Sequence, residues 1–273
     1  MKFKTQALAL FLKHTSYHRT NIWSCQRIHK GFTNVSYKIT TVDRQAFQVR
    51  IANDCHIVNR KNESKIYQKL HQNYFLYFDL RTGNAIKKWI SGKNPDKSEI
   101  NSPIFLKSFV KSLKQLRQIE PKGFLKHNYF DCLSKAKLPL KHKQAYLQLI
   151  ENYKDLPLVL SHNDLSADNL IYTNQHQVIF IDYEWSRLNN VYWDVANFIR
   201  EVNLPIVAIK YLCKALKINL QSLLVFVYLC TNYAYQWTFN MLQTKKIKLY
   251  RQQIFKKLEH YYQLAKIGEY THL

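Results

Sequence analysis

The segment SHNDLSADN, residues 161–169, lies between two apolar runs and contains the pattern His-x-Asp-x-x-x-x-Asn, formed by His162, Asp164 and Asn169. Asp182 ends the next apolar run, in the sequence IDYEW. Polar groups on a loop held between buried strands are typical of active sites. An amide oxygen and carboxylates are hard ligands suited to Mg²⁺. The pattern indicates phosphoryl transfer, which requires an oriented hydroxyl and neutralised phosphate charge.

The alternative for this loop is a polar hairpin without chemistry, because Asp and Asn favour turns through hydrogen bonds to nearby backbone groups. The position of Asp182 favours the active site. A kinase needs a catalytic-loop Asp and Asn, followed after a strand by a metal-binding Asp. The three residues occur here in that order, at suitable spacing.

The chain before this loop divides into a β-rich part and a helical part. Residues 34–53 read as two strands joined by a turn at Asp43–Arg44, and residues 60–72 read as a helix. Two more strands flank residues 81–84, where Thr-Gly-Asn supplies turn chemistry. The polar segment 91–101 contains Gly and Pro and is the expected hinge.

The chain after this hinge is mainly helical, with helical patterns at residues 104–119, 141–154 and most of 194–266. Two short strands, within residues 156–162 and 177–184, flank the polar loop. This order predicts an α+β protein with two lobes and a cleft between them.

The charge is strongly positive, with 41 Lys and Arg against 18 Asp and Glu, a formal net charge of +23. The basic residues are scattered, and no helix-turn-helix, RNA-binding or zinc signature occurs. Compositional bias combined with phosphate binding therefore explains the charge better than nucleic-acid recognition, and no nucleic-acid partner is expected.

The five cysteines are widely spaced, odd in number and without a CxxC motif, which predicts free buried thiols in a reducing compartment. The N-terminal segment reads as amphipathic and not as a signal peptide. The longest apolar run, Leu223–Cys230, is too short to span a bilayer. We expect a soluble cytoplasmic protein; the oligomeric state stays open, a homodimer included.

Residues 158–172 and 178–185, LVLSHNDLSADNLIY and VIFIDYEW, resemble the catalytic and metal-binding motifs of choline/ethanolamine kinases and their aminoglycoside phosphotransferase relatives. The spacing of acidic and amide residues over 182–201 is similar as well. The resemblance implies a two-lobed protein-kinase-like fold. A small β-rich lobe with one main helix, residues 1–91, would bind the nucleotide. A larger, mainly helical lobe, residues 92–273, would carry catalysis and the substrate.

The resemblance implies ATP and Mg²⁺ as cofactors. Asp164 would accept or orient the proton of the substrate hydroxyl, and His162 would orient the loop. Asn169 and Asp182 would hold Mg²⁺. It also implies that Arg50 contacts phosphate and pairs with Glu63. The cofactor-binding residues that the resemblance implies are Gly31, Thr33, Asn34, Arg50, Glu63 and Ile90.

The acceptor expected from this resemblance is a small cationic alcohol, most readily choline, whose quaternary ammonium suits aromatic faces and carboxylates. Tyr233 and Trp237 are four residues apart and share one helix face, although such a stripe is more often explained by core packing. The substrate-binding residues implied are Glu184, Trp185, Glu201, Tyr233 and Trp237.

Other acceptors and other classes of function remain open. Ethanolamine and thiamine are also hydroxyl-bearing cations, and an aminoglycoside is a less favoured acceptor because the chain has few acidic residues. The family's C-terminal tryptophan pair is not reproduced at its usual spacing, and Ser166 stands where eukaryotic relatives often have Gln. A nucleotide-binding pseudokinase and a basic nucleic-acid binder are the non-enzymatic alternatives. A choline-type kinase would act in phospholipid or lipopolysaccharide precursor metabolism.

Overall fold

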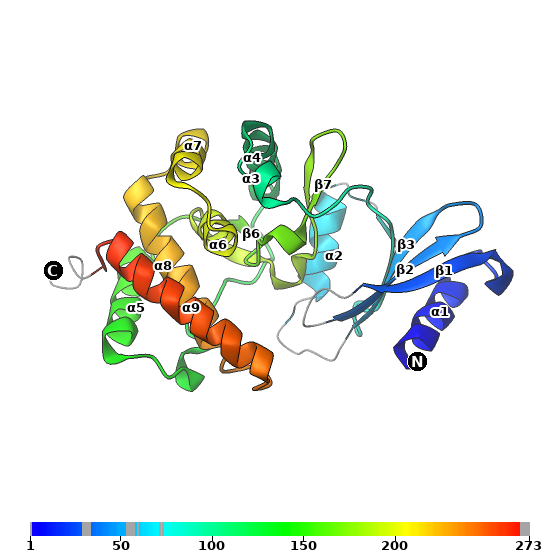
Figure 1. Ribbon diagram of the computed structural model, residues 1–273, viewed down its shortest axis with the longest axis horizontal. Helices are drawn as coiled ribbons and strands as arrows, with labels where there is room; N and C mark the ends of the chain where they lie inside the picture. The colour runs from blue at the N-terminus through cyan, green and yellow to red at the C-terminus, as the bar shows by residue number, and fades with distance from the viewer. Residues whose placement is uncertain are drawn as a thin grey trace.

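A five-stranded antiparallel sheet forms the first part of the chain (Figure 1). The structure is a computed structural model and describes residues 2–28, 34–52, 58, 60–70, 72 and 74–267. The strands pair in the order β1-β2-β3-β5-β4. Their bounds are β1 Ile22–Ile28, β2 Asn34–Thr41, β3 Ala46–Ala52, β4 Phe75–Phe78 and β5 Ala85–Lys88.

Both hairpins predicted from the sequence are present. β2 pairs with β3 around the turn at Asp43–Arg44, and β4 pairs with β5 around the turn that contains Gly83. Gly83 has φ +81°, and a Cβ there would lie 2.3 Å from Nε of Arg60. Only glycine fits this position, because both the backbone conformation and the close approach of Arg60 exclude a side chain.

Helix α1 (Lys2–His14) covers one face of this sheet and was not predicted as a helix. Its Ala7 and Phe11 are fully buried against Ile39, Phe47 and other apolar residues of β2 and β3. The β-rich part therefore has a second helix beside the predicted one, which is α2 (Arg60–Lys69). Strand β1 was also missed, because its burial pattern does not alternate.

The helical remainder packs around one larger core, and the helices predicted at 104–119, 141–154 and within 194–266 are confirmed. The predicted hinge contains one short helix, begun by an Asp96 side-chain cap. The short helix in the hinge is α3 Lys97–Ile100. The helices after the hinge are α4 Pro103–Arg117, α5 Leu140–Tyr153, α6 Trp193–Val202, α7 Ile206–Leu216, α8 Leu220–Trp237 and α9 Lys245–Leu264. The described residues also form short 3-10 turns, η1 Arg19–Asn21 before β1 and, after the hinge, η2 Leu133–Lys135, η3 Ala167–Asn169 and η4 Tyr183–Trp185.

Two small antiparallel sheets hold the polar loop. The predicted strands are β6 (Leu158–Ser161) and β8 (Val178–Phe180), but they do not pair with each other. Instead β6 pairs with β9 (Arg187–Asn190), and β7 (Leu170–Tyr172) pairs with β8. β7 and β9 were not predicted from the sequence.

Helix α2 connects the β-rich part to the helical part. Its Ile66 and Tyr67 are buried in the larger core, whereas Glu63 on the same helix pairs with Arg50 of β3. The α+β class is confirmed by the order of these elements. The lobe boundary at residue 91 stays a prediction.

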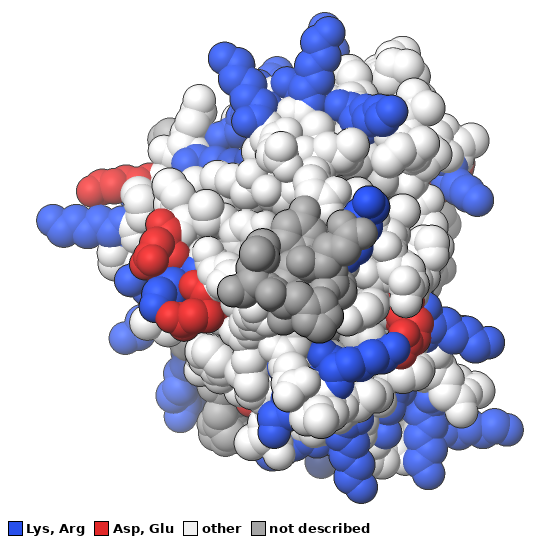
Figure 2. All heavy atoms as spheres, turned by 90° about the vertical axis from the view of Figure 1, so that its left-hand side faces the viewer, with Lys and Arg blue, Asp and Glu red and all other residues white. Residues whose placement is uncertain are grey.

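Other features of the chain bear on its class. Among the described residues no single helix is long and apolar enough to cross a membrane, and α7 and α8, which together reach that length, meet at a bend of 112°. Cys25, Cys132, Cys213 and Cys230 are free, and Cys55 lies outside the described residues. Figure 2 shows Lys and Arg side chains spread over the face it presents.

Phe109 of α4 tests the importance of the larger core. Its ring is fully buried and stacks on Phe198 of α6 with centroids 4.4 Å apart. We expect Phe109→Ala to lower the free energy of unfolding by about 3–5 kcal/mol through lost burial and a cavity. The exposed Ile104 on the same helix is the control, and Ile104→Ala should change it by less than about 0.5 kcal/mol. Equal midpoints in urea for the two variants would contradict this assignment of the core.

Candidate active site

Side chains of helix α6 hold the loop between β6 and β7 through hydrogen bonds to its backbone. The Asp194 carboxylate accepts the backbone N–H groups of His162 and Asn163, at 2.9 and 2.8 Å. The amide of Asn197 donates to the carbonyl oxygen of Leu165 at 3.1 Å. These bonds satisfy backbone groups that the loop could not pair by itself.

His162 is a structural member of this loop. It is fully buried, and its Nε2 lies 2.9 Å from the carbonyl oxygen of Ile181, so Nε2 carries the proton. Burial lowers the pKa of His162 from its ordinary value, although Asp194 partly opposes this effect. The neutral imidazole thus links the loop to the strand that leads into Asp182.

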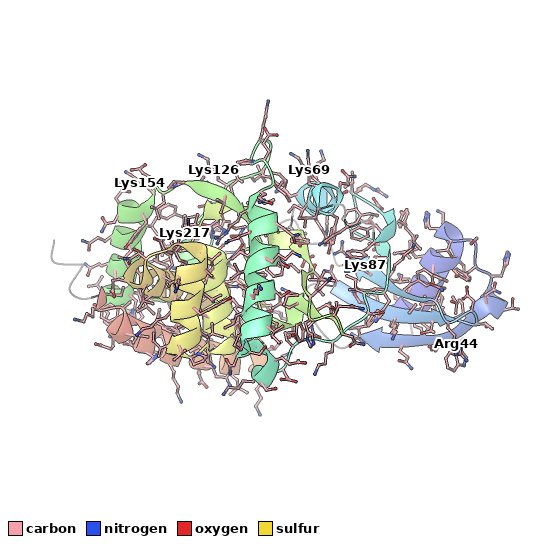
Figure 3. All side chains as sticks on the ribbon, turned by 90° about the horizontal axis from the view of Figure 1, so that it is seen from above. Arg44, Lys69, Lys87, Lys126, Lys154 and Lys217 are labelled. Atoms are coloured by element: carbon pink, nitrogen blue, oxygen red, sulfur yellow. The ribbon has the colours of Figure 1, made fainter. Side chains whose placement is uncertain are left out.

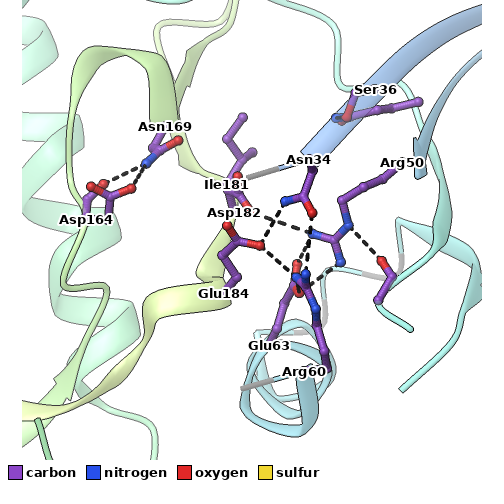
Figure 4. A network of polar contacts seen from close by, with 12 residues as sticks. Asn34, Ser36, Arg50, Arg60, Glu63, Asp164, Asn169, Ile181, Asp182 and Glu184 are labelled. Carbon is purple, nitrogen blue, oxygen red and sulfur yellow. Dashed lines mark hydrogen bonds and ion pairs between the residues drawn. The ribbon is translucent and has the colours of Figure 1, made fainter. Parts of the chain in front are cut away.

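Asp164 and Asn169 point toward each other across the loop (Figure 4). The Asn169 amide nitrogen donates to the main-chain oxygen of Asp164 at 2.7 Å and to its Oδ2 at 2.9 Å. Both N–H groups of that amide are therefore used, which leaves the Asn169 side-chain oxygen as an acceptor or metal ligand. Burial, followed by repulsion from Asp182 and Glu201, raises the pKa of Asp164 to about 7.

Asp182 is presented by an unusual backbone conformation. It follows the end of β8 with φ 67° and ψ 61°, the left-handed region that costs a non-glycine residue energy. Its N–H donates to the hydroxyl of Tyr67 at 3.1 Å, and its Oδ1 lies 3.6 Å from Arg50. Burial and the nearby Glu184 carboxylate raise the pKa of Asp182 to about 7.

These residues fit a divalent cation. The Oδ1 of Asp182 is buried without a hydrogen-bond partner among the described residues, and the Asn169 oxygen is the other hard donor. Within that part of the chain, no group of three His, Cys, Asp or Glu forms a complete metal cage. This donor set suits Mg²⁺, which is commonly held by one or two protein oxygens together with phosphate and water. A bound cation would also offset the repulsion between Asp164 and Asp182.

A buried ion network lies beside Asp182 (Figure 4). Arg50 binds Glu63 through two bonds of 2.7 and 2.9 Å, and its Nε donates to the Gly83 carbonyl oxygen at 3.0 Å. Arg60 continues the network, with its Nη1 3.4 Å from Glu63 and 2.7 Å from Glu184. The expected pairing of Arg50 with Glu63 is therefore present, and Arg60 was not anticipated.

Two predicted site residues lie in this network. Glu184 was expected to bind substrate, but its Oε2 accepts from Asn34 at 2.9 Å and from Arg60, and the side chain is 2% exposed. Asn34, expected near the nucleotide, thus connects the start of β2 to the segment after β8. Gly31 and Thr33 lie outside the described residues. The roles of all these residues remain predictions.

One cavity of about 920 Å³ brings most of the predicted residues together. His162 and Glu63 are not in its wall; they support residues that are. The predicted residues that line it are Asn34, Arg50, Ile90, Asp164, Asn169, Asp182, Glu184, Trp185, Glu201, Tyr233 and Trp237.

Several aromatic side chains line the cavity. Trp185 and Trp237 meet edge to face with ring centroids 6.4 Å apart, and Tyr233 packs in the same way on Trp193 at 5.8 Å. Glu201 lines the same cavity, and its carboxylate is paired with Arg200 at 2.6 Å. Partly exposed aromatic faces and a carboxylate in one cavity suit a small organic cation.

Sequence reasoning missed several other residues in the cavity wall. They come from separate elements whose approach only the fold reveals, and none stands in a motif. Lys87 of β5 is one of them. Successive residues of a strand point to opposite faces, so of the adjacent Lys87 and Lys88 one had to face inward, and this signal could have been used. The missed residues with polar side chains include Lys87, His127, Asp131, Arg187 and Tyr250.

Comparisons with known proteins agree with this geometry. The family model for choline/ethanolamine kinase matches residues 25–267. The uncharacterized protein MG356 homolog of Mycoplasma pneumoniae is 36% identical over 267 residues, 94% of this chain and 93% of that protein.

Solved structures show the same fold. A choline/ethanolamine kinase family protein from Mesorhizobium loti matches with a TM-score of 0.77 and 14% identity, over 99% of this chain and 97% of that chain. The choline kinase LicA from Streptococcus pneumoniae matches with a TM-score of 0.72 and 15% identity, over 95% of this chain and 98% of that chain. These likenesses confirm the predicted kinase-like α+β fold.

Arg60 provides a test of the ion network. Replacing it in Arg60→Met leaves Glu184 buried without its guanidinium partner, and we expect a loss of roughly 3 kcal/mol in unfolding free energy. Turnover should fall as well, because Glu184 follows Asp182 by two residues. The neighbouring Lys61 is exposed, so Lys61→Met is a matched control expected within about 0.5 kcal/mol of the wild type. Indistinguishable urea unfolding curves for the two variants would rule out a stabilising network.

Proposed function

The chain belongs to the choline/ethanolamine kinase family, and on that premise we propose that it transfers the γ-phosphoryl group of ATP to the hydroxyl group of choline. It is an ATP-dependent small-molecule kinase. The single observation that supports choline is the composition of the cavity. The loop residues Asp164 and Asn169 line the same space as the aromatic residues Trp185, Tyr233 and Trp237.

The reaction proposed is an in-line displacement at the γ-phosphorus. The choline oxygen forms the new bond to phosphorus while the bond to the β–γ bridging oxygen breaks, and ADP leaves. Asp164 orients the hydroxyl and takes its proton. A pKa raised by burial to about 7 suits this proton transfer near neutral pH. Asn169 and Asp182 would hold Mg²⁺, which supplies neutralisation of phosphate charge when bound.

The other residues position the reactants. Arg50 lies between Glu63 and Asp182, so it is fixed where it can face phosphate oxygens. Trp185, Tyr233 and Trp237 would surround the trimethylammonium group, and Glu201 would offset part of its charge. Binding at both ends holds the hydroxyl near the phosphorus and excludes water, which limits ATP hydrolysis.

The division of the chain follows this scheme as a further part of the proposal. Residues 1–91 would form the nucleotide-binding lobe and residues 92–273 the catalytic and substrate-binding lobe. The sheet residues of the cavity, such as Arg50, support the first assignment, and the position of Asp164 supports the second. Helix α2 packs into the larger core, so we expect the two lobes to depend on each other for stability.

The acceptor is tested by release of ADP from Mg-ATP with choline, ethanolamine, thiamine and an aminoglycoside in turn. We expect choline to give the highest kcat/KM, with phosphocholine identified by ³¹P NMR. Choline has no N–H donors and therefore matches aromatic faces better than ethanolamine does. Turnover of thiamine or ethanolamine with choline inert would overturn the choline assignment and leave the kinase assignment in place.

The role of Asp164 is tested by Asp164→Asn, which keeps size but removes the proton acceptor. We expect kcat to fall by roughly 10²–10⁴-fold, the usual contribution of general base catalysis. ATP binding, measured by calorimetry, should change little. Asp155→Asn makes the same substitution at an exposed site and should leave kcat unchanged. Equal kcat in the two variants would remove Asp164 from the mechanism.

A further inference from the structure

Lys87 is a cation inside the cavity that neither the loop motif nor the ion network explains. β5 pairs with β3 so that Lys87 lies opposite Gln48, and Ala85 lies opposite Arg50. Lys87, Gln48 and Arg50 all line the cavity. Among the labelled cations in Figure 3, Lys87 lies at the junction between the sheet and the helical part.

The ammonium group of Lys87 has no carboxylate partner in the described part of the chain, where the ion pairs within 4 Å involve other cations. Its Nζ lies 6.0 Å from the ring centroid of Tyr67, whose hydroxyl binds the N–H of Asp182. Burial lowers the pKa of Lys87, and Asp182 partly restores it. A half-buried cation without a carboxylate partner is stabilised when an anionic ligand pairs with it.

The neighbouring Arg50 is largely occupied. Its Nε, Nη1 and Nη2 each donate a bond to Gly83 or Glu63, so three of its five N–H groups are used. The carboxylates of Glu63, Asp182 and Glu184 outnumber the guanidinium groups of Arg50 and Arg60 by one. Adding the charge of Lys87 makes this group of side chains neutral. A bound triphosphate with its metal would bring further negative charge, which Lys87 could face.

We propose that Lys87 is a second phosphate-binding residue, which contacts the phosphate chain of the nucleotide beside Arg50. This inference rests on the proposed nucleotide site and adds a ligand contact to it. Three N–H donors of Arg50 are already bonded to Gly83 and Glu63. The ammonium group of Lys87 would supply further donors, which can rotate toward phosphate oxygens. Lysine suits this role, because its compact charge can follow a phosphate chain without fixed fork geometry.

The test is calorimetric binding of ATP, ADP and adenosine to wild type, Lys87→Met, Lys87→Arg and Lys88→Met. Loss of one charged contact should weaken ATP and ADP binding by roughly tenfold in Lys87→Met. Adenosine, which has no phosphate, should bind as it does to the wild type. Lys87→Arg keeps the charge and should restore most of the ATP affinity. Lys88 is exposed on the same strand, so Lys88→Met should match the wild type.

Each other result rejects the proposal. Wild-type ATP affinity in Lys87→Met would show that the residue makes no phosphate contact. An equal loss for adenosine and ATP would assign Lys87 to the adenine side or to folding. Failure of Lys87→Arg to recover ATP binding would likewise exclude a charge-based role. If the wild type binds no adenine nucleotide, the proposed nucleotide site itself is wrong. If the wild type binds ATP but Lys87→Met binds it equally well, only the role of Lys87 is wrong.

Discussion

The bidentate ion pair between Arg50 and Glu63, continued through Arg60 to Glu184, is the interaction on which the geometry of the site depends (Figure 4). The four side chains are each less than a tenth exposed and come from β3, from α2 and from the turn after β8. Removing one partner leaves a charge buried without compensation, which typically costs several kcal/mol. The three segments are therefore held in one arrangement, and Asp182, two residues before Glu184, takes its position from it.

The loop between β6 and β7 is fixed by a separate set of hydrogen bonds. Asp194 holds two backbone N–H groups of the loop, and the buried His162 joins it to the strand that leads to Asp182. The two supports meet at the carboxylates of Asp164 and Asp182. Burial raises the pKa of both groups, and Asp182 adds to the rise at Asp164. A cation bound between these two carboxyl groups would favour their ionised forms, and Mg-ATP would bring such a cation. The scattered positive charge of the chain also suits a phosphate ligand.

The sequence predicted the loop, because the spacing of Asp164, Asn169 and Asp182 carries chemical information that no packing is needed to interpret. It predicted the longer helices and both hairpins for the same kind of reason, since their periods are visible locally. It did not predict the network role of Arg60 or the pairing of β6 with β9. Arg60 reads as an ordinary helix residue, and its contact with Glu184 spans 124 positions. Contacts of that range depend on the fold.

Glu63 and Glu184 act as members of one coupled network, because Arg60 contacts both carboxylates. The most direct measurement is a double-mutant cycle on kcat/KM with Glu63→Gln, Glu184→Gln and the double variant, with the exposed Glu151→Gln as control. A coupled network predicts that each single change lowers kcat/KM, and that the double variant loses little more than the worse single variant. A double variant whose loss equals the product of the two single losses would contradict it, because the two carboxylates would then act independently.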